Sequence, residues 1–173
     1  MPAPARRPTA SPAARFDSLE QEAYLQLWRT YDRLREIDER VFARRGISAQ
    51  QYNALRVLRS VHPAGLATAA LGARLVSRAP DMTRLLDKLE ERGLVRRRRR
   101  ADNRRVVDAW ITPAGAAFVR RLAESVRRCG RDQLGHLDRP TLRTLIAILE
   151  EARRPHEADA DATAWPGGGH RRR

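Results

Sequence analysis

Residues 77–112 constrain the fold of this chain more than any other segment. They begin with an amphipathic stretch whose apolar side chains recur at helical spacing: Met82, Leu85, Leu86 and Leu89. Gly93 follows as a helix stop, and five consecutive arginines at 96–100 lead through a polar turn into an alternating apolar stretch that ends at Thr112. This order of a short helix and a basic hairpin predicts a winged helix-turn-helix, which is a mainly α fold with a small β-hairpin wing.

Helices are predicted before this segment. The spacing of apolar residues predicts a long helix over 17–45, closed by Gly46, and a second helix over 48–60 with a capping box between Ser48 and Gln51. The first of these is longer than a small core needs, so we expect part of it to face a second subunit.

Two shorter helices are predicted to form the helix-turn-helix unit. Thr68 is placed to cap a helix over 69–75, and the next helix is predicted to begin at 78–79 with Pro80 in its first turn, where a missing amide is tolerated.

The hairpin and two further helices complete the predicted order. Strands are predicted over 94–99 and 105–111. A long helix is predicted to start at Pro113 and to end near residue 134, and Asp138 is placed to cap a last helix that ends near residue 154.

The charge of the chain favours a polyanionic partner. Its 35 Lys and Arg residues against 21 Asp and Glu residues give a formal net charge of +14, and each cation placed on a phosphate releases a condensed counterion. A GC-rich genome is an alternative explanation for the excess of arginine, since Lys88 is the only lysine. It does not explain why the arginines cluster, so nucleic acid is the leading candidate.

The cysteine content and the chain ends indicate a cellular compartment. Cys129 is the only cysteine, which permits no disulfide within the chain and is typical of the reducing cytoplasm. No stretch approaches the roughly 20 apolar residues of a membrane span. We expect a cytoplasmic, nucleoid-associated protein with disordered tails at 1–16 and 155–173. A transit peptide is the alternative for the first tail, and its prolines argue against one.

The residue pattern argues against an enzyme. The four histidines lie scattered in predicted loops and tails, no glycine-rich phosphate loop precedes a helix, and no G-x-S-x-G motif occurs. No cluster of His, Cys and acidic residues has the spacing of metal ligands. We therefore expect no catalytic residue, no metal and no cofactor.

The helix predicted from 78–79 turns polar side chains outward once its apolar face is buried. Arg84 can pair with guanine, Thr83 can contact a base edge, and Arg78 and Lys88 suit phosphates. A solvated helix face with surface charge pairs is the alternative. The candidate recognition residues are Arg78, Ala79, Thr83, Arg84 and Lys88.

The arginine-rich hairpin supplies a second candidate contact. Side chains alternate along a strand, so about half of the arginine run can face phosphates at one time and add affinity rather than specificity. Arg104 at the turn suits a narrow minor groove, and Asp102 is placed to hold a neighbouring arginine. A solvated or RNA-binding basic tract is the alternative. The candidate wing residues are Arg97, Arg98, Arg99, Asp102, Arg104 and Arg105.

Residues 66–115 resemble the MarR family of bacterial transcription regulators. The hallmarks of that family are a Leu-Glu-x-x-Gly-Leu-Val phrase, an Asp-x-Arg wing and a strand that ends in Thr-x-x-Gly. This chain carries them at 89–95, 102–104 and 112–115. The helix order also fits, so that the resemblance extends over about 17–154.

The resemblance implies a homodimer that reads palindromic double-stranded DNA and acts as a repressor. It implies an N-terminal dimerisation helix at 17–46, a DNA-binding region at 47–112 and C-terminal dimerisation helices at 113–154, and the two tails at 1–16 and 155–173 lie outside it. It places Arg104 in the minor groove and the helix from about residue 78 in the major groove.

The resemblance also implies release from DNA by a small phenolic or lipophilic compound. The candidate ligand-binding residues are Tyr24, Trp28, Tyr31 and Tyr52. Core or dimer-seam packing is the alternative for these aromatics. Some family members sense peroxide through a cysteine near the N-terminus, and Cys129 lies too far downstream for that assignment.

Two other function classes remain open at this point. A sequence-independent, architectural nucleic-acid binder would have equal affinity for any duplex, whereas a regulator prefers one site over random DNA. A protein-interaction module would leave the charge of the wing unexplained.

Overall fold

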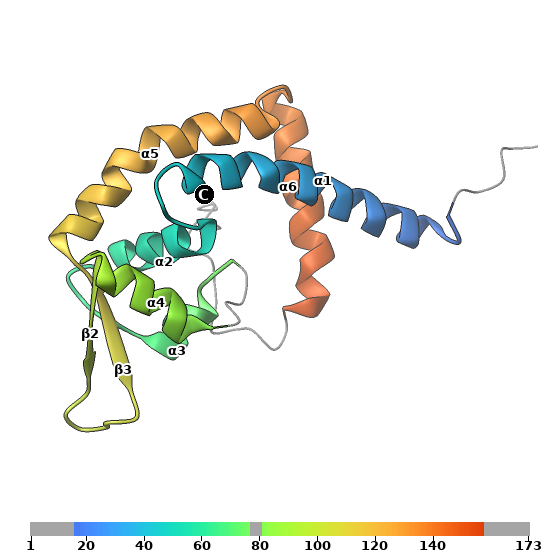
Figure 1. Ribbon diagram of the computed structural model, residues 1–173. Coiled ribbons are helices and arrows are strands. Elements are labelled where there is room, and N and C mark those ends of the chain that lie inside the picture. Colours follow the sequence, from blue (N-terminus) through green and yellow to red (C-terminus); the bar gives the residue numbers. More distant parts are fainter. Residues whose placement is uncertain (1–15, 77–80, 158–173) are drawn as a thin grey trace, which may run out of the picture. The chain divides into compact units, whose positions relative to one another are not determined.

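The computed structural model describes residues 16–76 and 81–157 of the 173-residue chain. It is mainly helical with one small antiparallel sheet, which confirms the predicted fold class (Figure 1). The chain divides into two compact units, Met1–Glu36 and Ile37–Arg173, and the first helix crosses from one into the other. The elements are α1 (Leu19–Ala43), α2 (Ala49–Ser60), β1 (Leu66–Ala67), α3 (Thr68–Ala73), α4 (Met82–Glu91), β2 (Val95–Arg99), β3 (Val107–Ile111), α5 (Pro113–Leu134), α6 (Arg139–Arg153) and the 3₁₀ turn η1 (Arg154–His156).

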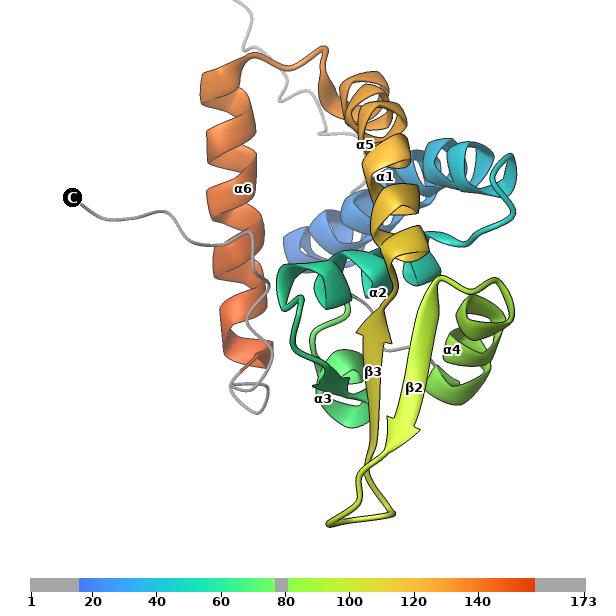
Figure 2. The ribbon, with the colours of Figure 1, turned by 90° about the vertical axis from the view of Figure 1, so that its left-hand side faces the viewer.

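The three strands are arranged in the order β1-β3-β2. β2 and β3 form the predicted hairpin, in which Val95 lies opposite Ile111 and Arg99 lies opposite Val107. The hairpin projects past the helices, and α4 lies beside β2 (Figure 2). β1 was not predicted because two residues are too few to show an alternating pattern; it pairs with the other edge of β3.

Three helices begin at the capping residues that the sequence predicts. The Ser48 hydroxyl accepts a hydrogen bond from the Gln51 backbone N at 3.1 Å, and the Gln51 side chain accepts one from the Ser48 N at 2.9 Å. Thr112 and Asp138 cap α5 and α6 by accepting from the backbone N three residues further on, at 3.0 and 2.9 Å. Each cap satisfies amides that have no partner within the helix, so these starts are fixed locally.

Two other predicted helix starts are wrong. The N-cap of α3 is Ala67, which has no side-chain acceptor, and Thr68 is already helical. Because α3 follows β1 directly, strand pairing with β3 holds the two residues before the helix. α4 begins at Met82, because Asp81 is its N-cap. Pro80, expected in the first turn of that helix, lies outside the described residues.

The core of the second unit lies among α2, α3, α4, the sheet and the first half of α5. Its most deeply buried side chains are aliphatic and include Leu55, Leu58, Leu71, Leu86 and Leu89. Gly46 and Gly93, which the sequence marks as helix stops, have φ of +62° and +64°, a left-handed conformation that favours glycine. Because Leu85, Leu86 and Leu89 of α4 are buried in this core, the side chains on the opposite side of that helix face outward.

Large apolar side chains remain exposed on α1 and α6. Tyr24, Trp28 and Tyr31 of α1 are each about 60% exposed, and Ile146 and Ile148 of α6 are more than half exposed. In α6, which the structure describes in full, no residue is buried.

Across the described ranges, no helix has the length and apolar character that crossing a membrane requires.

Gly115 and Gly130 test the packing of α5 against the sheet. A Cβ at Gly115 would lie 2.1 Å from the Leu94 carbonyl oxygen, whereas Gly130 of the same helix has open space around it. We expect Gly115→Ala to lower the free energy of unfolding by about 1–3 kcal/mol. Gly130→Ala is the matched control and should raise it by up to about 1 kcal/mol through helix propensity. Urea unfolding followed by circular dichroism measures both, and equal effects would contradict the packing.

Candidate nucleic-acid interface

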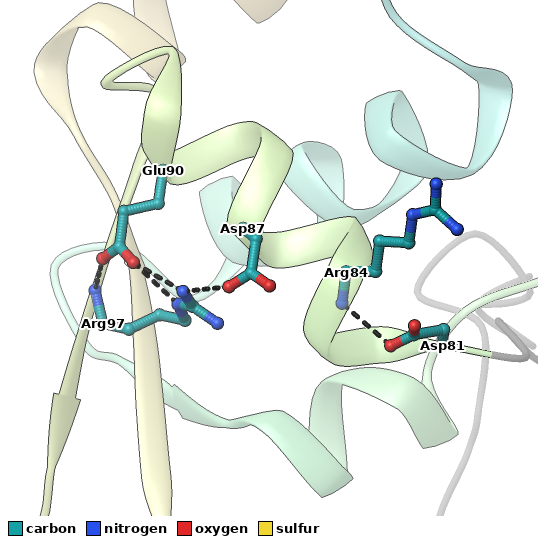
Figure 3. Close-up of polar contacts among 5 residues, drawn as sticks. All are labelled: Asp81, Arg84, Asp87, Glu90 and Arg97. Carbon is teal, nitrogen blue, oxygen red and sulfur yellow. Dashed lines mark hydrogen bonds and ion pairs between the residues drawn. The ribbon is translucent and has the colours of Figure 1, made fainter.

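Helix α4 presents a polar face opposite its buried one. Leu85, Leu86 and Leu89 lie in the core as predicted, and Thr83, Arg84 and Lys88 are exposed. The Asp81 carboxylate accepts a hydrogen bond from the Arg84 backbone N at 2.8 Å (Figure 3). This bond uses the backbone of Arg84 and does not involve its guanidinium group. Arg78 and Ala79, the other two predicted recognition residues, lie outside the described residues.

Arg97 of β2 binds two carboxylates of α4 (Figure 3). Its Nη2 donates to Asp87 Oδ1 at 2.5 Å and to Glu90 Oε2 at 2.7 Å, and its Nε donates to Glu90 Oε2 at 2.9 Å. Its backbone N also donates to Glu90 Oε1 at 2.7 Å. Desolvation lowers the pKa of Arg97, but the hydrogen bonds that it donates to Glu90 and Asp87, with the charges of these carboxylates, outweigh that effect, so the net shift of the pKa is upward. This contact joins α4 to the wing.

Two more arginines of the run are held within the hairpin. The Arg96 guanidinium stacks over the Trp110 ring, 4.9 Å from its centroid, and a Cβ at Gly65 would collide with that same ring. Arg100 donates to both carboxylate oxygens of Asp108, at 2.7 and 3.0 Å, and this hydrogen bonding raises the pKa of Arg100. The run therefore contains three arginines with partners in the protein.

The other two arginines of the run, Arg98 and Arg99, are exposed, as are Arg96 and Arg100. Among the residues that the structure describes, the side chains of Arg98 and Arg99 have no hydrogen bond or ion pair, although their backbones pair with β3. Both line a cleft of about 610 Å³ between the hairpin and the helix-turn-helix, together with Thr83 of α4. Met82 and Val107 contribute apolar lining to this cleft. The exposed side chains of Arg98 and Arg99 therefore lie beside the polar face of α4.

The tip of the hairpin is ordered by Asn103, which the sequence analysis did not single out. Its side-chain oxygen accepts from the Arg105 backbone N at 3.1 Å, and its carbonyl accepts from the Val106 N at 2.9 Å. Such an asparagine turn is a recognisable local signal. Arg104 and Arg105 are both exposed at this tip.

Within the hairpin itself, the carboxylate that binds an arginine of the run is Asp108, whereas Asp102 was the residue predicted to do so. Asp102 contributes only a minor electrostatic effect that raises the pKa of Arg100. The sequence analysis assigned Asp108 no role. The signal that could have found it is its place opposite Arg98 in the hairpin register, within reach of Arg100 on the same face.

The aromatic residues predicted to bind a ligand have different environments. On α1, the Tyr24 and Trp28 ring centroids lie 6.1 Å apart and both side chains are exposed, as is Tyr31. Tyr52 is buried in the core of the second unit, 5.2 Å from the Phe42 ring centroid. Tyr52 thus has the core environment that the alternative interpretation describes.

Cys129 is a buried residue of α5. Its Sγ donates to Asp38 Oδ1 at 3.2 Å, and burial together with this carboxylate raises the pKa of the thiol to about 12. A thiol with so high a pKa is poorly reactive at neutral pH, because the thiolate is the reacting form. Within the described ranges, no group of three or more His, Cys or acidic residues is arranged to hold a metal ion.

Comparisons with known proteins agree with this geometry. Residues 47–107 match the model of the MarR family. The chain is 55% identical to a solved structure described as a MarR transcription factor from Planctomyces limnophilus, with a TM-score of 0.63, and the match covers 79% of this chain and 98% of that one. No curated protein matches the chain.

More distant structures share the fold. One is a cysteine-to-serine mutant of MarR from E. coli in complex with operator DNA, at 21% identity and a TM-score of 0.67, covering 79% of this chain and 99% of that one. Another is BpsR from Bordetella bronchiseptica, whose DNA binding is described as regulated by 6-hydroxynicotinic acid, at 19% identity and a TM-score of 0.66, covering 82% of this chain and 97% of that one.

The Arg97 contact predicts unequal effects of neighbouring arginines on stability. Arg97→Ala leaves the Asp87 and Glu90 carboxylates without their shared cation, so we expect it to lower the free energy of unfolding by about 2 kcal/mol. Arg98→Ala removes the same charge from an exposed side chain and should change it by no more than about 0.5 kcal/mol. Urea unfolding measures both variants, and a loss in Arg98→Ala as large as that in Arg97→Ala would overturn the assignment.

Proposed function

The chain belongs to the MarR family of DNA-binding transcription regulators, and on that premise we propose that it is a repressor that binds palindromic operator DNA as a homodimer. The observation that supports this most is the joining of α4 to the wing through Arg97. With these two elements held together, exposed cations on both can contact one duplex at the same time. Because its target is DNA, we place the protein at the nucleoid in the cytoplasm.

We assign the DNA contacts by exposure and by position. Thr83 and Arg84 on the outer face of α4 contact base edges in the major groove, and Lys88 contacts a phosphate. Arg78 and Ala79 belong to the same proposed surface. Each of these proposals keeps the residues that the sequence predicts.

The wing arginines divide between affinity and minor-groove contact. Arg98 and Arg99 bind phosphates, Arg104 enters the minor groove and Arg105 supports it at the tip. Arg97 supports this surface from within the protein, because its charge offsets part of the negative charge of two carboxylates that would otherwise repel the DNA backbone. Asp102 remains a proposed electrostatic partner of the wing arginines.

The proposed dimer uses residues 17–46 and 113–154. The exposed apolar side chains of α1 and α6 support this division, since large apolar side chains gain free energy when a second subunit covers them. Residues 47–112 form the DNA-binding region between these parts, and 1–16 and 155–173 are proposed tails.

We further propose that a small phenolic or lipophilic compound releases the protein from DNA. The compound described as regulating DNA binding by BpsR, 6-hydroxynicotinic acid, is a small aromatic acid. Exposed aromatics on α1 supply candidate contacts at Tyr24, Trp28 and Tyr31. Tyr52 has too little exposed surface to take part unless the core opens.

A sequence-independent architectural protein is the second candidate function. The free cations at Arg98 and Arg99 favour it, because phosphate contacts carry no sequence information. Equal affinity for operator and random duplex across a salt series would select this alternative.

Arg104 provides a test of the regulator proposal. We expect Arg104→Ala to weaken operator binding by about 1–3 kcal/mol, because a specific minor-groove contact is lost. Arg120→Ala removes an exposed cation from α5 and is the matched control for net charge. Fluorescence anisotropy with a labelled operator duplex measures both, and unchanged affinity in Arg104→Ala would sink the assignment.

The dimer proposal has an independent test. Light scattering should give twice the 19.7 kDa mass of the chain. Ile146→Asp places a charge on the exposed apolar face of α6 and should shift the protein towards monomer. A monomer mass for the unmodified protein at micromolar concentration would reject the proposed architecture.

A further inference from the structure

Arg92 directly follows α4 and reaches the turn that ends α1. Its Nη1 donates to the Gly46 carbonyl oxygen at 2.5 Å, and its Nη2 donates to the Arg45 carbonyl oxygen at 3.2 Å. The two acceptors are consecutive backbone carbonyls, which the planar fork of a guanidinium can engage together. The end of the recognition helix is therefore tied to a segment 46 residues away in sequence.

The turn that accepts these bonds is a defined structure. Gly46 adopts φ of +62°, and backbone hydrogen bonds from Arg45 and Gly46 to Phe42 and Ala43 hold the turn closed at 2.9 and 3.0 Å. The accepting carbonyls belong to this turn, two and three residues after the last residue of α1. Hydrogen bonds to a charged donor are stronger than those to a neutral one, so the Arg92 guanidinium is a favourable partner for both carbonyls.

Arg92 also contacts α5. Its guanidinium lies 5.3 Å from the centroid of the buried Phe118 ring, and Arg121 lies over the same ring at 5.9 Å. One side chain at the end of the recognition helix thus contacts the end of α1 and the first half of α5. Arg121 shares the ring but belongs to α5 itself, so it does not tie α4 to anything.

We propose that Arg92 is a positioning residue that fixes the recognition helix to the end of α1 and to α5, and thereby sets the spacing of the two operator half-sites. This inference rests on the proposed dimer, in which α1 and α5 belong to the parts that join the two subunits. A two-fold dimer reads a palindrome through two recognition helices at a fixed separation. That separation depends on how each helix is attached to the dimerisation helices, and Arg92 is such an attachment.

The test compares operator duplexes whose half-site spacing differs. A duplex selected from a random pool serves as the operator, and derivatives carry one base pair added to or removed from its centre. The unmodified protein should lose at least about tenfold in affinity on the altered duplexes, a penalty of the size of one mismatched position. Arg92→Ala should lose affinity for the selected duplex and should discriminate the altered duplexes by about threefold or less.

Two further variants separate positioning from charge and from folding. Arg121→Ala removes the same charge and the same kind of ring contact, and it should keep the spacing preference of the unmodified protein. Arg92→Lys keeps the charge but lacks the fork for two carbonyls, so its spacing preference should be intermediate. It also provides the test if Arg92→Ala does not fold, as judged by circular dichroism.

The outcomes have distinct meanings. Relaxed spacing in both Arg92 variants, with spacing preserved in Arg121→Ala, supports the inference. Full spacing discrimination in folded Arg92 variants overturns the inference and leaves the proposed function standing. Equal binding of selected and random duplexes by the unmodified protein overturns the proposed function, and this inference fails with it.

Discussion

The ion pairs between Arg97 of β2 and the two carboxylates of α4 connect the proposed DNA-reading helix to the wing. The shared apolar core already holds the base of the hairpin against α4, because Leu94 and Val95 are buried with Leu86 and Leu89, and Arg97 adds a polar contact further along β2. Arg97 uses its guanidinium and its backbone amide on Glu90 and reaches Asp87 as well. Charge-assisted hydrogen bonds are shorter and stronger than those between neutral groups. Helix α4 and the wing are thereby joined by several such bonds from one side chain.

This arrangement changes the meaning of the basic run. Five consecutive arginines suggest a uniform cationic strip, yet Arg96, Arg97 and Arg100 have partners in the protein. Alternation along the strand places Arg96, Arg98 and Arg100 on one face, and neighbouring side chains then decide which of them stays free. Within the described part of the chain, Arg98 and Arg99 are the members of the run whose guanidinium groups have no such partner. Positive charge in the run therefore stabilises the hairpin as well as facing a polyanion.

Local signals explain what could be predicted from the sequence. The caps at Ser48 and Thr112 and the left-handed stops at Gly46 and Gly93 need only their near neighbours, and the structure confirms them. Features that failed or were missed depend on distant partners. β1 forms because it pairs with the edge of β3. Arg97 donates to carboxylates seven and ten residues earlier, and Tyr52 packs on Phe42 of another helix. Periodicity cannot reveal such pairs, because a charged or aromatic side chain has many possible partners until the fold selects one.

A crystal structure of the protein with a selected operator duplex would test the role of Arg97 most directly. We predict that Arg97 remains within hydrogen-bond distance of Asp87 and Glu90 in the complex, while Arg98 and Arg99 contact phosphates and Arg104 lies in the minor groove. An Arg97 guanidinium found on a phosphate or a base, with both carboxylates released, would contradict the proposal that it acts from within the protein to hold helix and wing together.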